Sequence, residues 1–212
     1  MQALPVEKLP EGDWLYEIKH DGYRALAFKD GKDVRLVSRN EKAFDYPQLL
    51  DALKLLPAER VILDGEIAAL DEKGRSSFQL LQMFKSSGDV PLVYYVFDLL
   101  FLEGKDLRKE PLSARRKLLA NLLKKSPVHI RLSEELRGAK DDLLRVAQEF
   151  GLEGLIAKKP NSVYESGRRS GAWVKFKIAQ VKFTEWTNGA QLRQPVFLEL
   201  RTDKEAKDVV RE

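Results

Sequence analysis

The stretch Leu15-Tyr16-Glu17-Ile18-Lys19-His20-Asp21-Gly22-Tyr23-Arg24 governs the interpretation of this chain of 212 residues. Residues 14–20 predict a strand, Asp21-Gly22 is a two-residue turn signal, and residues 23–28 predict the next strand. The stretch therefore places a lysine at the end of one strand and an arginine near the start of another.

Lys19 is the candidate nucleophile of this stretch, and Arg24 follows five residues later. An amine must be neutral to attack phosphorus, and nearby cations favour the neutral form. Lys175 and Lys177 are candidates to supply those charges. Taken alone, the stretch fits a surface hairpin with solvated charges equally well.

Outward from this stretch, strand and helix patterns are mixed without a repeat or a regular βαβ rhythm. This mixture favours an α+β fold with mainly antiparallel sheets. Ser113 is expected to cap a basic amphipathic helix. Its Arg115-Arg116-Lys117 run, with Lys124-Lys125, is interpreted as a solvated face, and a DNA contact is the alternative. Further strands are expected at 33–37, 61–70, 92–100, 128–132, 155–159 and 173–177, and helices at 47–56, 77–84, 113–125 and 141–150.

Composition excludes several classes of protein. The chain has no cysteine, which excludes disulfides, thiolate zinc sites and a cysteine nucleophile, and suits a reducing cytosol. No apolar run approaches the roughly 18 residues of a membrane span, and no signal peptide is visible. The net charge of +4 and the pI of about 9.1 fit a polyanionic partner, although many basic proteins have none.

Five further short motifs carry polar groups beside apolar strands. In Trp173-Val174-Lys175-Phe176-Lys177 the two lysines alternate with apolar residues, so both face one side and could bind phosphate. Glu66 and Glu153 interrupt or bound apolar runs, where an unpaired carboxylate would be costly. A divalent cation or a ribose hydroxyl would explain them, and oxygen ligands favour Mg²⁺ over zinc. The other motifs are Ser38-Arg39-Asn40, Asp64-Gly65-Glu66, Phe97-Asp98 and Glu153-Gly154-Leu155-Ile156-Ala157-Lys158.

In this order, the six motifs resemble those of the covalent nucleotidyltransferase superfamily of ATP-dependent DNA ligases, RNA ligases and mRNA-capping enzymes. The likeness covers roughly residues 14–177. It is closer to the ligase domain of bacterial non-homologous end-joining ligases, because of the opening stretch and two segments of the tail. These segments are Phe183-Thr184-Glu185-Trp186 and Leu192-Arg193-Gln194-Pro195-Val196-Phe197-Leu198.

The resemblance implies a role for each matching residue. Lys19 would be the nucleophile that becomes lysyl-AMP, with ATP as the nucleotide. The remaining assignments are Glu17 at the adenine, Ile18 at the nucleotide, Phe97 stacked on the base, Arg24 and Glu66 at the ribose, Arg39 and Arg169 at phosphate or nucleotide, Lys175 and Lys177 at the α-phosphate, Glu66 and Glu153 at Mg²⁺, and Arg201, Asp203 and Lys204 of an RxDK motif at the pyrophosphate.

Two domains are expected. Residues 1–180 would form an adenylation domain of the covalent nucleotidyltransferase (ATP-grasp-like) fold, and residues 181–212 a hairpin remnant of an OB fold. The tail of 32 residues is shorter than the roughly 45 residues of a five-stranded barrel. Most of the OB domain would then be missing, either in a natural minimal form or by deletion.

The function expected from the resemblance is a DNA ligase that seals nicked double-stranded DNA in bacterial repair by end joining. Other end-joining proteins would be its partners, and it would be a monomer, cytoplasmic and associated with the nucleoid rather than a membrane. Two alternatives remain. One is an RNA ligase or capping-type nucleotidyltransferase, and the other a nucleotide- or DNA-binding module with little turnover. His20 and His129 are expected to be solvated or satisfied histidines.

Overall fold

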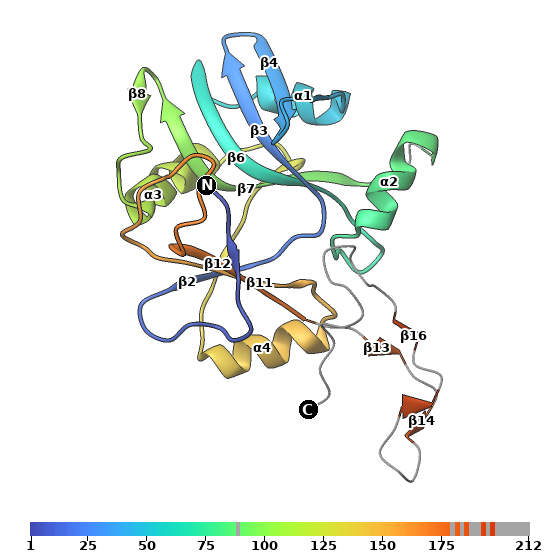
Figure 1. The fold of residues 1–212 in the computed structure, drawn as a ribbon. Coiled ribbons are helices and arrows are strands. Elements are labelled where there is room, and N and C mark those ends of the chain that lie inside the picture. The colour runs from blue at the N-terminus through green and yellow to red at the C-terminus, as the bar shows by residue number, and fades with distance from the viewer. Residues whose placement is uncertain (88–89, 179–180, 183–184, 187–191, 194–195, 198–212) are drawn as a thin grey trace. The chain divides into compact units, whose positions relative to one another are not determined.

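The computed structural model describes residues 1–87 and 90–178, and the pairs 181–182, 185–186, 192–193 and 196–197. The chain divides into two compact units, Met1–Lys177 and Ile178–Glu212. The described part of the first unit contains two β-sheets and four helices (Figure 1). The fold is α+β, as predicted.

The larger sheet has seven strands, and its centre is the most buried part of the protein. All neighbours pair antiparallel except β7 and β9. Central strands are nearly continuous apolar runs because both of their faces are covered. In order they are β5 (Ala43–Phe44), β4 (Asp33–Ser38), β3 (Tyr23–Asp30), β6 (Arg60–Ala69), β7 (Leu92–Leu102) and β8 (Lys105–Asp106), with β9 (Ile130–Leu132) beside β7.

The smaller sheet has five strands and carries the predicted nucleophile. β11 pairs antiparallel with both β2 and β12, so Glu17 lies opposite Ile156, which in turn lies opposite Lys175. In order the strands are β1 (Leu4–Pro5), β12 (Trp173–Lys177), β11 (Gly154–Lys158), β2 (Leu15–Ile18) and β10 (Glu135–Leu136).

Four helices pack against the sheets: α1 (Pro47–Lys54), α2 (Phe78–Ser87), α3 (Leu112–Leu122) and α4 (Lys140–Glu149). α1 begins with proline, whose fixed backbone suits a first turn, and buries Leu49 and Leu53. α1 lies against β4, α2 against β6, α3 against β7 and α4 against β11. Figure 1 shows α4 beside β2, β11 and β12, apart from the larger sheet. No helix in the described part of the chain is long and apolar enough to cross a membrane.

The Asp21-Gly22 pair does not close a hairpin, so the structure excludes the surface hairpin that the opening stretch alone would also fit. β2 and β3 belong to different sheets, so the chain crosses from one sheet to the other at this point. Gly22 is needed for the crossing, because a Cβ there would lie 2.0 Å from the carbonyl oxygen of Ile67 in β6. The DG pair therefore brings the two sheets together directly after Lys19.

The prediction for the basic helix needs two corrections. Ser113 does not cap α3, whose N-cap is Pro111 and has no side-chain cap. Arg115 and Arg116 are buried rather than solvated, and only Lys117 of that run is exposed. The charge of the run suggested a solvated helix face, but both arginines form ion pairs with buried carboxylates from other parts of the chain.

In the second unit, β13 (Val181–Lys182) pairs antiparallel with β16 (Val196–Phe197), and β14 (Glu185–Trp186) with β15 (Leu192–Arg193). This nested pairing is that of the hairpin predicted from the sequence. Residues 187–191, between β14 and β15, and the RxDK segment lie outside the described residues. The assignment of this unit to an OB remnant stays a prediction.

Candidate active site

One cavity in the first unit is lined by residues of both sheets. It receives Glu17 and Ile18 from β2, Arg24 from β3, and Lys175 from β12. Nine of the predicted site residues line it: Glu17, Ile18, Lys19, Arg24, Arg39, Glu66, Phe97, Arg169 and Lys175. Segments that are distant in the sequence therefore meet at one cavity.

Two other predicted site residues do not line the cavity. Lys177 follows Lys175 by two positions on β12 but is not among the residues that line the cavity. Glu153 also lies outside the lining, yet its carboxylate contacts the Lys19 amine. Arg201, Asp203 and Lys204 lie outside the described residues.

Lys19 is held at both its backbone and its side chain. Its backbone N–H donates to the carbonyl of Gly154 at 2.9 Å, which ties the end of β2 to the start of β11. Its Nζ forms an ion pair with Glu153 Oε2, and the two side chains are only 12% and 9% exposed. The amine is thus fixed beside a carboxylate at the wall of the cavity, rather than free in solvent as in a surface hairpin.

Glu17 lies at the centre of a buried ionic network. Its side chain is 2% exposed, and its Oε1 accepts hydrogen bonds from Arg116 Nη1 and Lys158 Nζ, each at 2.8 Å. Ser133 Oγ donates to Oε2 at 2.8 Å. Burial lowers the pKa of Lys158, while the Glu17 carboxylate opposes that change. Charge pairing of this kind is what makes a buried carboxylate tolerable.

The sequence interpretation assigned no role to Arg116, Lys158 or Ser133. Lys158 ends the motif Glu153-Gly154-Leu155-Ile156-Ala157-Lys158, and its place at the end of an apolar strand is the signal that could have identified it. Arg116 was hidden in a basic run, and Ser133 carries no recognisable pattern.

Arg24 is oriented by a second network. Its Nε and Nη2 donate to the two oxygens of Asp64 at 2.9 and 2.6 Å. Tyr164 Oη donates to Asp64 Oδ2 at 2.7 Å. Burial opposes the charge of Arg24, but Asp64 outweighs burial and raises the pKa of the guanidinium. This bidentate geometry fixes the plane of Arg24 against the cavity.

The cavity wall combines aromatic rings and cations. Phe97 and Trp173 lie edge to face with centroids 5.8 Å apart. Lys158 Nζ lies 4.4 Å from the centroid of each ring, and Arg24 Cζ lies 5.4 Å from that of Phe97. Such contacts attract cations to ring faces. A wall of this kind suits a ligand with both a flat ring and negative charge.

Cations outnumber carboxylates around the cavity. The lining includes six basic side chains, Lys19, Arg24, Arg39, Lys158, Arg169 and Lys175, against two acidic ones, Glu17 and Glu66. Burial raises the pKa of Glu66 to about 7, although Lys19 and Arg24 oppose that shift. The charge balance therefore favours an anionic ligand such as a phosphate ester.

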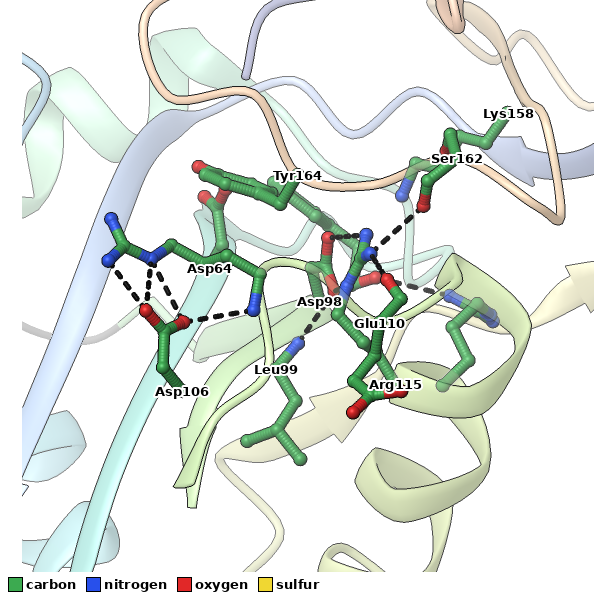
Figure 2. Close-up of polar contacts among 12 residues, drawn as sticks. Asp64, Asp98, Leu99, Asp106, Glu110, Arg115, Lys158, Ser162 and Tyr164 are labelled. Atoms are coloured by element: carbon green, nitrogen blue, oxygen red, sulfur yellow. Dashed lines mark hydrogen bonds and ion pairs between the residues drawn. The ribbon is translucent and has the colours of Figure 1, made fainter. Parts of the chain in front are cut away.

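Arg115, the neighbour of Arg116 on α3, has a different role. Its Nε and Nη2 donate to the two oxygens of Asp98, both at 2.8 Å, in a pair with no exposed side-chain surface (Figure 2). Its Nη1 donates to the carbonyls of Glu110 and Ser162. Neither Arg115 nor Asp98 lines the cavity, so this pair attaches α3 to β7.

Both histidines have partners. The His20 ring stacks on Tyr95 with centroids 3.8 Å apart, and burial, with Lys158 and Lys19, lowers its pKa to about 3. His129 Nδ1 lies 2.8 Å from the carbonyl oxygen of Leu92. His129 is thus a satisfied histidine, as predicted, and His20 packs by ring stacking. No group of three or more His, Asp or Glu side chains able to hold a metal occurs among the described residues.

The chain is similar to known proteins over most of its length. A family model described as "ATP dependent DNA ligase domain" matches residues 3–177. The "Multifunctional non-homologous end joining protein LigD" of Pseudomonas aeruginosa is 42% identical over 179 residues, which are 82% of this chain and 21% of that protein. The corresponding "DNA repair protein LigD" of Mycobacterium tuberculosis H37Rv is 37% identical over 174 residues, which are 81% of this chain and 22% of that protein.

The fold is likewise similar to solved structures. A structure of mycobacterial DNA ligase D complexed with ATP and MES superposes with a TM-score of 0.76 at 26% identity, covering 99% of this chain and 97% of that one. The chain spans only about a fifth of the length of the two LigD proteins.

Proposed function

Because this chain belongs to the family of ATP-dependent DNA ligase domains, we propose that it is the adenylating core of a DNA ligase. The observation that carries the proposal is the position of Lys19, whose amine lies at the wall of a cationic and aromatic cavity beside Glu153. The substrates would be ATP and the nicked double-stranded DNA that the resemblance implies.

In the first step the Lys19 amine attacks the α-phosphorus of ATP. A P–N bond forms, the bond to pyrophosphate breaks, and the amine loses a proton, which leaves lysyl-AMP. Arg39, Arg169 and Lys175 line the same cavity and would neutralise charge on the phosphates. Phe97 offers a ring face to the base, and Glu66 a carboxyl group to the ribose.

Two carboxylates are consistent with a bound Mg²⁺. Glu153 contacts Lys19 directly, and Glu66 lines the same cavity as Lys19. The described residues offer no larger acidic cluster. Such a set suits Mg²⁺, which commonly takes one or two carboxylates and completes its shell with water and substrate phosphates. When bound, Mg²⁺ would offset the charge that develops on the phosphates.

The later steps transfer AMP to DNA. An oxygen of the DNA 5′-phosphate attacks the phosphorus, the P–N bond breaks, and Lys19 regains its proton. A 3′-hydroxyl then attacks the activated 5′-phosphate, forms the phosphodiester and releases AMP. Positioning and electrostatics dominate such phosphoryl chemistry.

An RNA ligase or capping-type nucleotidyltransferase would share the first step. The likeness to LigD proteins favours DNA and end joining for this chain. Nicked DNA, nicked RNA and labelled GTP offered in competition separate these activities. A binding module with little turnover would hold ATP without forming a stable covalent adduct.

The decisive experiment is a mass spectrum after incubation with ATP and Mg²⁺. The wild-type chain should gain the mass of one adenylate, and Lys19→Ala should gain none. Lys159→Ala is a matched control, because Lys159 is an exposed lysine outside the cavity lining, and it should be adenylated like the wild type. An adduct that persists in Lys19→Ala contradicts the assignment.

The remaining features of the resemblance are part of the proposal. Residues 1–180 would be the adenylation domain and 181–212 would belong to an OB fold, whose Arg201, Asp203 and Lys204 would contact pyrophosphate. The protein would act as a cytoplasmic monomer with other end-joining proteins near the nucleoid. The two compact units divide at Lys177, close to the proposed boundary.

A further inference from the structure

We infer that Arg116 is a positioning residue that makes the base site selective for adenine, acting through Glu17 and Phe97. This inference rests on the proposed function and deepens it. It concerns a side chain that does not line the nucleotide cavity but bonds to two residues that do.

One guanidinium connects three separate segments of the chain. Arg116 Nη1 donates to Glu17 Oε1 at 2.8 Å and to the backbone carbonyl of Phe97 at 3.3 Å. Its Nη2 donates to the backbone carbonyl of Ser133 at 2.8 Å. Arg116 is 8% exposed, so these bonds form largely away from competing water. The base-facing residues of β2 and β7 are thus fixed relative to each other by a single side chain of α3.

The same contacts determine what the Glu17 carboxylate can recognise. A carboxylate only accepts hydrogen bonds, and its two oxygens offer about four acceptor sites. Arg116 and Lys158 occupy Oε1, and the Ser133 hydroxyl occupies one site of Oε2. Among the described residues no further donor reaches this carboxylate, which leaves one acceptor site on Oε2. A ligand that approaches Glu17 must therefore present a hydrogen-bond donor.

The need for a hydrogen-bond donor distinguishes adenine from guanine and hypoxanthine. Adenine carries an amino group at its sixth position, which can donate to the remaining site. Guanine and hypoxanthine carry a carbonyl oxygen there, so two acceptors would face each other without a proton between them. A buried polar site with an unmatched partner discriminates strongly against the wrong ligand. Arg116 contributes by preventing the carboxylate from turning away to relieve that conflict.

A purely structural role is the competing explanation, and the neighbouring arginine illustrates it. Arg115 pairs with Asp98, and neither residue lines the cavity. The partners of Arg116 differ, because Glu17 and Phe97 both line it. A structural role predicts lower stability alone, whereas a positioning role predicts a change in the preference between nucleotides.

The test compares self-adenylation with ATP and with ITP, whose base has a carbonyl oxygen at the sixth position and a proton on N1, where adenine has an amino group and an unprotonated nitrogen. Wild type should prefer ATP by about 100-fold or more in kcat/KM. In Arg116→Met that preference should fall about 10-fold or more, mainly through a higher KM for ATP. Arg116→Lys keeps the charge but cannot reach all three partners, so it should restore only part of the preference.

Ser133→Ala provides an independent variant if Arg116→Met fails to fold. It removes the donor to Oε2 without removing a charge and should lower the preference several-fold. The ratio of the two kcat/KM values does not depend on the fraction of folded enzyme, so loss of stability cannot imitate this result.

Two controls match Arg116 in charge, and the second also matches it in burial. Lys117→Met removes the exposed cation next along α3. Lys29→Met removes a cation that is also 8% exposed and donates to the carbonyls of Lys54 and Leu56, outside the cavity. Both should keep the wild-type preference, although Lys29→Met should unfold at a lower temperature.

An unchanged preference in Arg116→Met and Ser133→Ala overturns the inference, as does an equal fall in Lys29→Met. If the wild type forms no adduct with ATP, the proposed function fails instead. Calorimetric binding of ATP and ITP to the same variants then decides the inference separately, because binding does not require the chemistry of Lys19.

Discussion

Replacement of Gly22 by alanine adds a single methyl group, yet it should lower both the stability of the protein and the rate of adenylation. A Cβ at this position would lie 2.0 Å from the carbonyl oxygen of Ile67 and 3.2 Å from Glu66 Cγ. Real contacts of this kind are at least about 3 Å, so one of the two segments must move by about 1 Å. β6 cannot easily move, because Ile67 is fully buried between β3 and β7.

The displacement should therefore fall on residues 19–22, which are themselves tied at both ends. The Lys19 N–H bonds to Gly154, and Asp21 bonds to Ser76 and to the backbone of Phe78. Overpacking typically costs about 1–3 kcal/mol of stability. A shift of about 1 Å in a reacting group can cost about 100-fold in rate. Gly22→Ala should show both losses.

Single-turnover adenylation followed by mass spectrometry measures the rate, and urea unfolding measures the stability. Val34→Ala is the control, because Val34 packs on the core of the larger sheet away from the cavity. It should lose stability but adenylate at the wild-type rate. If Gly22→Ala also reacts at the wild-type rate while folded, the close approach of β6 does not position Lys19, and the reasoning is refuted.

Four other variants test three separate parts of the site. Tyr164→Phe removes a hydrogen bond to the buried Asp64 carboxylate and should lower the free energy of unfolding by about 1.5–3 kcal/mol while sparing the Lys19 adduct; loss of the adduct in folded protein would contradict this. His20→Phe should keep the stacking on Tyr95 and flatten the pH dependence of stability. The pKa of His20 is about 3 in the folded protein and ordinarily 6.5, so the wild type loses stability as pH falls from about 6.5 towards 3. If the urea midpoints of the wild type and the variant change in the same way between pH 7.5 and pH 5, the prediction is contradicted. Glu153→Ala and Glu66→Ala should each raise the Mg²⁺ concentration needed for half-maximal adenylation, and an unchanged Mg²⁺ titration in both would count against a metal site at these residues.

Much of the fold could be predicted because its signals are local. Apolar runs marked β6 and β7, and Pro47 marked the start of α1. The crossing between sheets at Gly22 could not be predicted in this way. A DG pair permits a tight turn whether the flanking strands pair with each other or separate, and the choice depends on the approach of Ile67, which lies 45 residues later.

The residues of the candidate site also differ in whether the neighbouring sequence could identify them. Lys19, Glu66 and Phe97 could be identified because short motifs surround them, and the cavity brings them together. Tyr164 could not, since its partner Asp64 is 100 residues away in the chain. Hydrogen bonds between distant segments leave no pattern in a single sequence.

The two arginines of α3 show why a basic run cannot be interpreted by its charge. Successive residues on a helix point about 100° apart, so Arg115 and Arg116 must reach different partners. Asp98 lies 17 residues before Arg115 and Glu17 lies 99 residues before Arg116, and both carboxylates would be costly if buried alone. The informative signal was therefore in the acids rather than in the helix. A buried carboxylate within an apolar strand is stabilised by a buried cation. A helix packed on such a strand can use two adjacent arginines to pair with carboxylates on two different strands. One pair attaches the helix to β7, and that attachment brings the other arginine to Glu17 of β2.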